Sequence, residues 1–222
     1  MTKSVQESLL QQILDLPHAP ALLAALQTAL AEEQQKRLAF YNLISTEENK
    51  SEFINGEIII QSPVKHQHNE YSGLLYQLLN IYVSQNDLGF VGIEKIMISL
   101  TRNDYEPDVC YFRPEKAINF KKDQSPFPAP DLVVEVCSPK TESRDRGIKF
   151  EDYQNHGVEE YWIISPDDRV LEQYHLEDGA YRLIKKSDGG EVRSFVLPDL
   201  SFPIAAIFDK KHNLSVIATL LS

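Results

Sequence analysis

Apolar residues near the N-terminus recur with helical spacing. In residues 4–16, valine, leucine and isoleucine repeat every three or four positions, and the pattern ends before two prolines. Residues 21–40 have leucines on one side and the polar run EEQQKR on the other. The two segments predict a helical hairpin in front of the main domain. This hairpin could be an arm for dimerisation or partner binding, or it could cover an apolar patch of the same chain.

Strand and helix patterns alternate through the middle of the chain. The sequence EFINGEIIIQSP predicts two short strands joined by a turn at Asn55-Gly56. A helix is predicted from about residue 63 to 86, with leucines along its buried side. Two strands, 90–100 and 106–112, follow it and lead into a loop over 113–129.

The second half continues this alternation. DLVVEVCSP is a nearly continuous apolar run, typical of a strand buried on both faces of a sheet. A helix over about 142–156 and the buried strand EYWIIS follow it. Residues 169–197 predict a meander with turns at Asp178-Gly179 and Gly189-Gly190, and a short helix comes after Pro203. The order of elements predicts an α/β (α+β) fold with a mixed central sheet.

Composition and charge argue against some classes of function. The 222 residues are 42% hydrophobic and 25% charged, as in folded globular proteins, and the formal net charge is -11. Nucleic-acid coats and proteins that bind anionic membranes need clustered Lys and Arg, so this balance argues against both. The acidic residues are unevenly distributed along the chain. Residues 101–150 hold nine basic and nine acidic residues, whereas residues 151–200 hold five basic and twelve acidic ones. Acidity therefore does not exclude a local phosphate site within 101–150.

The two cysteines and the apolar segments indicate the cellular setting. Cys110 and Cys137 lie in apolar surroundings without CxxC spacing, which predicts buried, reduced thiols and a cytoplasmic protein. The first residues lack the apolar core of a signal peptide, and no segment approaches the ~20 apolar residues of a membrane span. No GxGxxG, P-loop, GxSxG or HExxH motif is present.

Two carboxylates lie in predicted buried strands, where burying a charged side chain costs free energy. Asp108 lies in the predicted strand EPDVCYF, and Glu135 lies in the middle of LVVEV. A buried carboxylate must be paired, protonated or bound to a metal. If the two strands are neighbours, both carboxylates can converge on one Mg²⁺ or Mn²⁺. The alternative is that each is satisfied by a neighbouring Lys or Arg.

Two further side chains are candidates for the same site. Lys149 lies on the helix after the Glu135 strand, and a Lys there can orient a water or stabilise phosphoryl charge. His68 lies near the start of the long helix. Residues 140–149 hold four basic side chains against two acidic ones, enough for a few phosphate contacts. The alternatives are a solvated Lys, a structural His and a charge-mixed helix start.

At these positions the chain resembles the PD-(D/E)XK nuclease superfamily. The short signature of the superfamily is Pro107-Asp108 followed by Glu135. A longer set of motifs over about 39–208 resembles a prokaryotic group of restriction-endonuclease-like proteins. These motifs are EFINGEIIIQSP with the later His68, EPDVCYF, PDLVVEVCSP, RDRGIKFEDYQNHGVEEYWIISP and LPDLSF.

The resemblance implies roles for named residues. It makes Asp108 and Glu135 the metal ligands and Lys149 a relocated substitute for the superfamily lysine, whose usual position is occupied here by Cys137. It also places His68, and Glu57 in the hairpin, as candidates for the same cleft.

The resemblance further implies a restriction-endonuclease-like sheet flanked by helices. The expected organisation is an N-terminal helical extension over 1–40, an endonuclease-like domain over 41–210 and a tail over 211–222. The expected activity is Mg²⁺- or Mn²⁺-dependent endonucleolytic hydrolysis of DNA by a cytoplasmic homodimer. The alternative is a weakly active or inactive nuclease fold that serves as a binding or scaffolding module, which the Cys137 substitution and the acidic balance favour.

Overall fold

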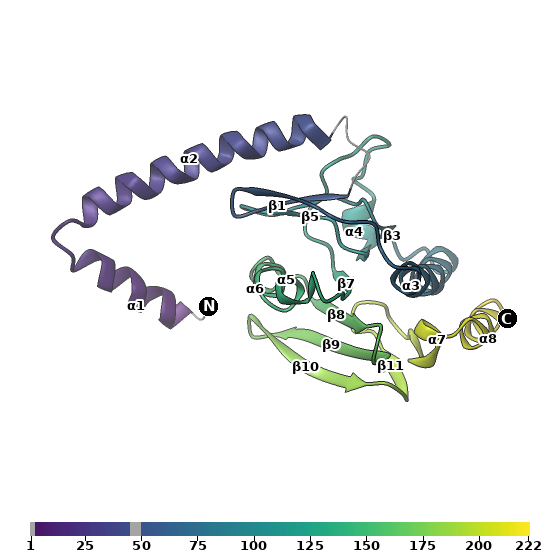
Figure 1. The fold of residues 1–222 in the computed structure, drawn as a ribbon. Coiled ribbons are helices and arrows are strands. Elements are labelled where there is room, and N and C mark those ends of the chain that lie inside the picture. The colour runs from purple at the N-terminus through teal and green to yellow at the C-terminus, as the bar shows by residue number, and fades with distance from the viewer. Residues whose placement is uncertain (1–2, 45–49) are drawn as a thin grey trace.

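The computed structural model describes residues 3–44 and 50–222 (Figure 1). Its helices are α1 Lys3–Leu14, α2 Ala19–Ile44, α3 His66–Gln85, α4 Pro114–Ala117, α5 Glu142–Asp145, α6 Ile148–Asn155, α7 Ala205–Phe208 and α8 Lys210–Leu220. Its strands are β1 Ser51–Ile54, β2 Glu57–Ile60, β3 Phe90–Ile93, β4 Ile98–Ser99, β5 Asp104–Tyr105, β6 Val109–Phe112, β7 Leu132–Val136, β8 Glu160–Ser165, β9 Val170–Glu177, β10 Ala180–Ser187, β11 Glu191–Arg193 and β12 Ser201–Pro203.

Six strands form the central sheet in the order β10-β9-β8-β7-β6-β3. β7 and β8 are parallel and the other neighbours are antiparallel, so the sheet is mixed, as predicted. Every residue of β7 is buried. Val134 and Val136 belong to one apolar cluster and Val133 to another, because successive side chains point to opposite faces. The prediction of a strand buried on both faces is therefore confirmed.

Helices cover both faces of this sheet. The leucines of α3 pack against β3, β6 and β7, and α7 and α8 lie beside α3 (Figure 1). On the opposite face, α5 and α6 lie over the sheet, and Tyr153 of α6 packs into the second apolar cluster. α8 begins at Lys210, one residue before the expected tail, and extends through most of it, and its Asn213 donates to the backbone oxygen of Leu74 (2.9 Å). The mixed α+β fold expected from the sequence is confirmed.

A second, smaller sheet has the order β2-β1-β5-β4. Its hairpin turns at Asn55 and Gly56, both with positive φ (51° and 84°), as the Asn-Gly pair predicts. Every residue of β1 is buried because β1 lies between β2 and β5, whereas β2 is an edge strand and largely exposed. The two strands therefore differ in burial, although EIII is the more apolar sequence.

Two predicted elements are divided in the structure, and a third is shorter than predicted. The strand over 90–100 separates into β3 and β4 around Glu94, whose φ is 58°. The strand predicted over 106–112 is shorter in the structure, because β6 begins only at Val109, so Asp108 precedes β6 rather than lying inside a strand. The helix over 142–156 separates into α5 and α6 at Gly147, where an added Cβ would lie 2.7 Å from the Ser143 backbone oxygen. At the first two positions the chain passes between the two sheets, and at Gly147 it changes direction after the end of β7.

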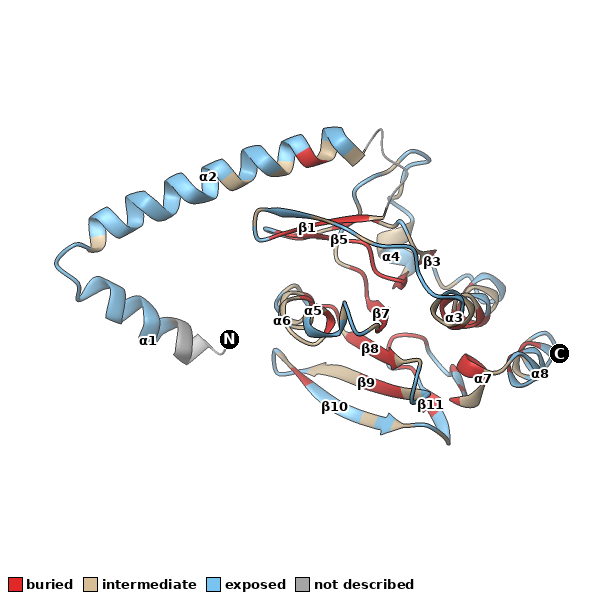
Figure 2. Ribbon diagram, in the orientation of Figure 1, coloured by how far each residue is buried: buried red, intermediate tan, exposed pale blue. Residues whose placement is uncertain are grey.

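The N-terminal helices project from the body as an arm (Figure 2). Among the described residues, α2 contacts the body through its second half, where Arg37 binds Asp104, Glu33 binds Arg102, and Phe40 packs on Phe53. The leucines of the earlier turns are exposed. The interpretation of the hairpin as a cover for an apolar patch is therefore wrong for these turns, because within the described residues their leucines stay 41–56% exposed.

The arm also contains the most membrane-like sequence. No single described helix is long and apolar enough to cross a membrane. The pair Glu7–Leu14 and Ala19–Ile44 meets the criteria of length and composition together, but the two segments are bent by 120°.

Candidate active site

The candidate residues meet where the two sheets approach each other. Asp108 immediately precedes β6, and Glu135 lies on β7. The antiparallel register pairs Val109 with Val134. Continuing it by one residue places Asp108 opposite Glu135, where cross-strand side chains are neighbours. Asp108, one residue before β6, and Glu135 on β7 are therefore neighbours across this strand pair, which is the condition for a shared site in the sequence analysis.

Asp108 is buried, and both of its carboxylate oxygens have polar partners. Its Oδ2 accepts a hydrogen bond from the Val136 backbone N–H (2.7 Å). Its Oδ1 accepts one from Lys50 Nζ (2.7 Å) and lies 3.2 Å from His68 Nε2. Burial acts to raise the pKa of Asp108, but the nearby Lys50 ammonium and His68 hold it well below its usual range. Asp108 is therefore ionised at neutral pH and has the geometry of an oriented ligand.

Lys50, His68, Glu94 and Asp108 form what we call the Asp108 cluster. One ligand atom from each of His68, Glu94 and Asp108 lies within 4.8 Å of the others, and Lys50 Nζ lies 3.4 Å from Glu94 Oε2. Glu94 Oε1 is buried and has no hydrogen-bond partner among the described residues. Two carboxylates and an imidazole suit Mn²⁺ or Mg²⁺, and a free carboxylate oxygen is available. The donor set therefore fits a divalent cation.

A second group, the Lys149 cluster, lies on the α6 side of Glu135. Lys149 is 3% exposed, and its Nζ lies 2.8 Å from Glu52 Oε1, 3.1 Å from Glu135 Oε1 and 3.5 Å from Asp145 Oδ1. Tyr153 donates its hydroxyl to the same Glu135 oxygen (3.3 Å). A single ammonium thus lies among three buried carboxylates.

Burial and neighbouring charges shift the pKa values of Lys149 and Glu135. Burial alone would lower the pKa of Lys149, but Glu135, Glu52 and Asp145 raise it well above its usual value. Burial raises the pKa of Glu135 well above its ordinary range, against the opposing effect of Lys149. Lys149 therefore stays protonated, and Glu135 holds a proton more readily than an exposed carboxylate does.

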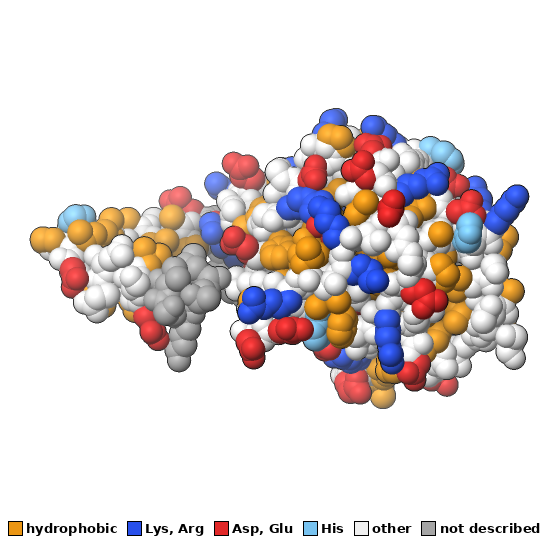
Figure 3. Space-filling view, turned by 90° about the horizontal axis from the view of Figure 1, so that it is seen from below, with side chains coloured by type: hydrophobic (Ala, Val, Ile, Leu, Met, Phe, Trp, Pro, Cys, Tyr) orange, Lys and Arg blue, Asp and Glu red, His pale blue; other side chains and the backbone are white. Residues whose placement is uncertain are grey.

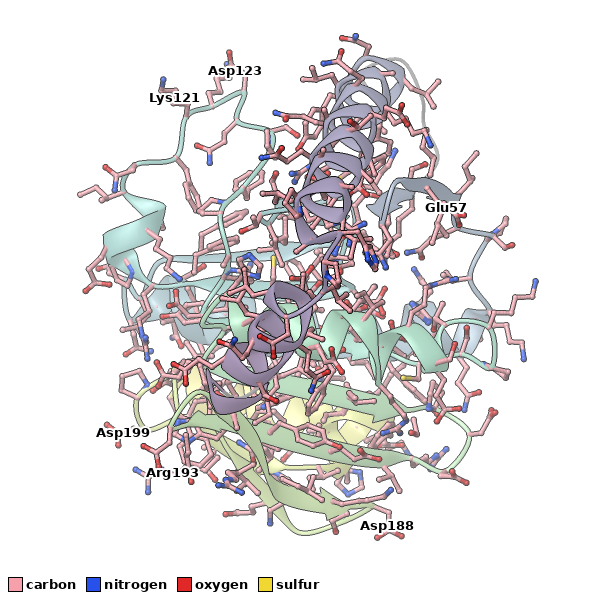
Figure 4. All side chains as sticks on the ribbon, turned by 90° about the vertical axis from the view of Figure 1, so that its left-hand side faces the viewer. Glu57, Lys121, Asp123, Asp188, Arg193 and Asp199 are labelled. Carbon is pink, nitrogen blue, oxygen red and sulfur yellow. The ribbon has the colours of Figure 1, made fainter. Side chains whose placement is uncertain are left out.

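The sequence candidates fall into two sets. Asp108, Glu135, Lys149 and His68 are brought together, with Lys149 on Glu135 and His68 on Asp108. Glu57 is exposed beside the hairpin turn, at the surface of the molecule (Figure 4). No hydrogen bond or ion pair between described residues connects Glu57 with the other four. Its catalytic role, like that of Glu135 as a metal ligand, stays a prediction.

Sequence reasoning missed Lys50, Glu52 and Glu94. Glu52 is fully buried and binds Lys149, yet it belongs to the less apolar strand of the hairpin. Glu52 can be distinguished from Glu57 as a site residue only when it is known which strand of the hairpin lies at the edge of the sheet. Glu94 reaches Asp108 because its positive φ turns the chain after β3, and no glycine marks that turn. Lys50 lies next to residues outside the described ranges, and the sequence around it has no pattern that would indicate a site residue.

Cys137 occupies the position two residues after Glu135 but does not act as a lysine there. Its thiol is buried, and Sγ lies 3.6 Å from Asp145 Oδ2. Burial and the Asp145 charge raise the pKa of the thiol, so it stays neutral. The positive charges of the site come instead from Lys149 and Lys50.

Comparisons with known proteins point to one family. A family model named Uma2, described as "Putative restriction endonuclease", matches residues 33–205. An uncharacterized protein from Synechocystis is 32% identical over 167 residues, which cover 72% of this chain and 83% of that protein. A crystal structure of "a putative nuclease belonging to DUF820" from Anabaena variabilis has a TM-score of 0.61 at 19% identity, covering 77% of this chain and 93% of that one. The arm residues before 33 lie outside the family match.

Proposed function

Because the chain belongs to the Uma2 family of restriction-endonuclease-like proteins, as its motifs predicted, we propose that it is a metal-dependent endonuclease that hydrolyses DNA phosphodiester bonds. The observation that carries this proposal is the convergence of two buried carboxylates from adjacent strands with Lys149, His68 and Glu94. Mg²⁺ or Mn²⁺ is the proposed cofactor, held by Asp108 with His68 and Glu94, and the neighbouring Glu135 is assigned to proton transfer.

When bound, such a cation supplies Lewis-acid chemistry, polarising a phosphoryl oxygen and making water more acidic. The chain's own residues orient the reactants. The Val136 N–H fixes the Asp108 carboxylate. Lys149 and Tyr153 hold Glu135 Oε1, and we assign Oε2 to accept a proton from the attacking water. Lys149 is too enclosed to touch a substrate, and we assign it to positioning Glu135. The Lys50 ammonium, 12% exposed, is better placed to meet phosphoryl charge.

A cleavage assay on plasmid and single-stranded DNA with Mg²⁺ or Mn²⁺ tests the proposal. We expect nicking by the unmodified chain and a loss of at least about 100-fold in Glu135→Gln, the size of effect typical of a general base. Glu57→Gln is the matched control, because it makes the same change outside both clusters, and it should retain activity. Equal inactivity of the unmodified chain and Glu135→Gln over a broad substrate panel would end the enzyme proposal.

The second candidate is a binding or scaffolding module, which the neutral thiol of Cys137 at the usual lysine position favours. Calorimetry with Mn²⁺ separates the two candidates. Uptake that Asp108→Ala abolishes supports the enzyme, and no uptake by either protein supports the scaffold.

We further propose that the protein is a cytoplasmic homodimer joined by the arm. Nine arm side chains are 39–59% exposed: Leu9, Leu10, Ile13, Leu14, Leu16, Leu22, Leu23, Leu26 and Leu30. Figure 3 shows apolar side chains gathered on this projection. Exposed apolar surface of this extent is typical of an interface. The cytoplasmic setting is proposed because Cys110 and Cys137 are buried and free.

A second copy is the proposed occupant because residues 16–31 contain no Asp, Glu, Lys or Arg. The uncharged stretches of two such hairpins can pack together without charge repulsion, in a symmetric four-helix arrangement that brings two active sites to one duplex. Sedimentation velocity should show a dimer that Leu23→Glu with Leu26→Glu converts to monomer. The control pair, Ile118→Glu with Leu183→Glu, changes two exposed residues of the body and should not alter the mass. A monomeric unmodified chain would contradict the proposal.

A further inference from the structure

A cavity of about 530 Å³ lies beside the Asp108 cluster. Its walls come from residues 59–68 between β2 and the start of α3, residues 137–144 after β7, and residues 166–167 after β8. His68 lines the cavity and also contacts Asp108. A molecule in the cavity would therefore lie next to the proposed catalytic groups.

The charge of the cavity is opposite to that of the chain. Lys65, Lys140 and Arg144 line it, and Asp167 is the only acidic side chain there, whereas the whole chain has a net charge of -11. None of the ion pairs between described residues involves these three cations. Arg144 Nε is buried and has no hydrogen-bond partner in the described part of the chain. A buried guanidinium nitrogen without an acceptor indicates an anionic ligand, and phosphate matches its geometry.

Apolar side chains form part of the remaining cavity wall, beside polar ones such as Gln61, Ser62 and Thr141. Ile59 and Ile60 lie on the hairpin side, and Pro63, Pro139 and Pro166 lie on the loops. The volume is within the range of small-molecule sites. Proline and isoleucine faces can pack against the π-face of a base without reading its identity, while polar groups hold the sugar and phosphate. The combination suits one nucleotide, with its base inside and its phosphate on the cations.

We propose that this cavity binds a single unstacked nucleotide of the nucleic-acid strand and presents the adjoining phosphodiester to the Asp108 cluster. The inference rests on the proposed function and deepens it by naming the preferred substrate. A base paired and stacked in a regular duplex cannot enter the cavity without leaving its stack, which costs a few kcal/mol. Single strands, bulges and mismatches avoid most of that cost. The protein therefore binds these structures in preference to regular duplex.

The test is a binding measurement that does not depend on cleavage. The full chain in EDTA and about 50 mM salt is titrated into DNA that carries 2-aminopurine, whose fluorescence rises when the base leaves its stack. The probes are a single strand of about 12 nucleotides, a duplex with one bulged 2-aminopurine and the fully paired duplex. We expect the bulged duplex to bind about tenfold tighter than the paired one, with a rise in fluorescence.

Two variants and their controls test the cavity itself. Arg144→Gln removes the phosphate contact and should weaken binding of the bulged probe about tenfold. Arg182→Gln makes the same change on exposed β10, away from the cavity, and should leave binding unchanged. Pro139→Trp fills the cavity and should abolish the fluorescence rise. Ile118→Trp adds similar bulk at a site that is 83% exposed and should preserve it. Thermal melting confirms that each variant is folded.

The outcomes separate this inference from the proposed function. Equal affinity for bulged and paired duplex, or an unchanged fluorescence rise in Pro139→Trp, overturns the nucleotide site even if the protein cleaves DNA. Cavity-dependent binding without any cleavage supports the nucleotide site and contradicts the proposed hydrolysis. No binding to any probe overturns the nucleotide site.

Discussion

At the scale of single residues, Lys149 is an ammonium group buried among carboxylates. One ammonium, almost without exposure to water, lies within 3.5 Å of an oxygen from each of three buried carboxylates, Glu52, Glu135 and Asp145. Buried carboxylates are costly unless a positive charge or a proton compensates them. Lys149 therefore contributes to folding as well as to the orientation of Glu135.

Replacing Lys149 by Met should remove that compensation and leave the carboxylates to repel one another. We expect the free energy of unfolding to fall by about 3–5 kcal/mol, as when one partner of a buried ion pair is removed. Urea denaturation measures the change. Lys122→Met is the control, because Lys122 is exposed, and its effect should stay within about 0.5 kcal/mol. A small loss in Lys149→Met would mean that the carboxylates are protonated in the native state.

Glu172 makes stability depend on acid pH. It is 2% exposed on β9 and accepts hydrogen bonds from Arg146 (2.7 and 3.0 Å), Tyr174 and Lys186. Burial opposes ionisation, but these donors lower the pKa of Glu172 to about 2, from 4.5 for an exposed Glu. The ionised form therefore stabilises the native state above about pH 4.5, and this contribution is lost as pH falls towards 2.

Glu172→Gln should therefore lower the free energy of unfolding at neutral pH by about 1–2 kcal/mol, after allowance for solvent screening. The difference from the unmodified chain should shrink as pH falls below about 4.5. Urea melts across the acid range test this, with Glu177→Gln on the same strand as the exposed control. A difference that stays constant with pH would show that the ionisation of Glu172 does not contribute to stability.

At the scale of elements, two arginine–carboxylate pairs attach α2 to the body in different ways. The Arg37 guanidinium binds both oxygens of fully buried Asp104 (2.6 and 2.8 Å) and also donates to the Leu100 backbone oxygen (2.7 Å). The pair between Arg102 and Glu33 is just as short (2.6 Å), but the Arg102 side chain is 49% exposed. Distance alone does not separate the two pairs, and burial does.

We expect Arg37→Ala to lower the free energy of unfolding by about 3 kcal/mol, because it leaves Asp104 buried and without its cation. Arg102→Ala should cost at most about 1 kcal/mol, the usual value for exposed pairs. Hydrogen exchange along α2 is the second readout, and it should increase in the last turns only in Arg37→Ala. Equal effects of the two substitutions would contradict this assignment.

Elements also show where local patterns fail. The period of apolar residues located β7, β8 and α3 well, because each is buried along most of its length. The same period continued through Glu94 and Gly147, where the chain changes direction. An apolar pattern reports burial, and a chain can stay buried while it passes from one sheet to another.

At the scale of the whole molecule, net charge and local charge have different consequences. The formal net charge of -11 opposes general attraction to DNA. The cavity beside the Asp108 cluster has three cations with no ion-pair partner among the described residues. Binding should therefore be local and use few phosphate contacts.

The salt dependence of binding measures how many phosphates are contacted. With three cations at the cavity, the logarithm of affinity for single-stranded DNA should fall against the logarithm of salt concentration with a slope of about -2. Arg144→Gln should reduce the slope by about 0.7. A slope of about -5 or steeper would require a broad basic surface and would contradict a local site.

The sequence alone determined the mixed sheet and its central strands, and it singled out Asp108 and Glu135 as buried carboxylates, because side-chain period and burial are local properties of each segment. Only the tertiary structure decided which hairpin strand is buried, so that Glu52 and not Glu57 meets Lys149. It also decided that Glu94 and Lys50 join Asp108, and that the apolar side of the arm faces outward. Each of these depends on contacts between distant segments, and the order of polar and apolar residues within one segment does not report such contacts.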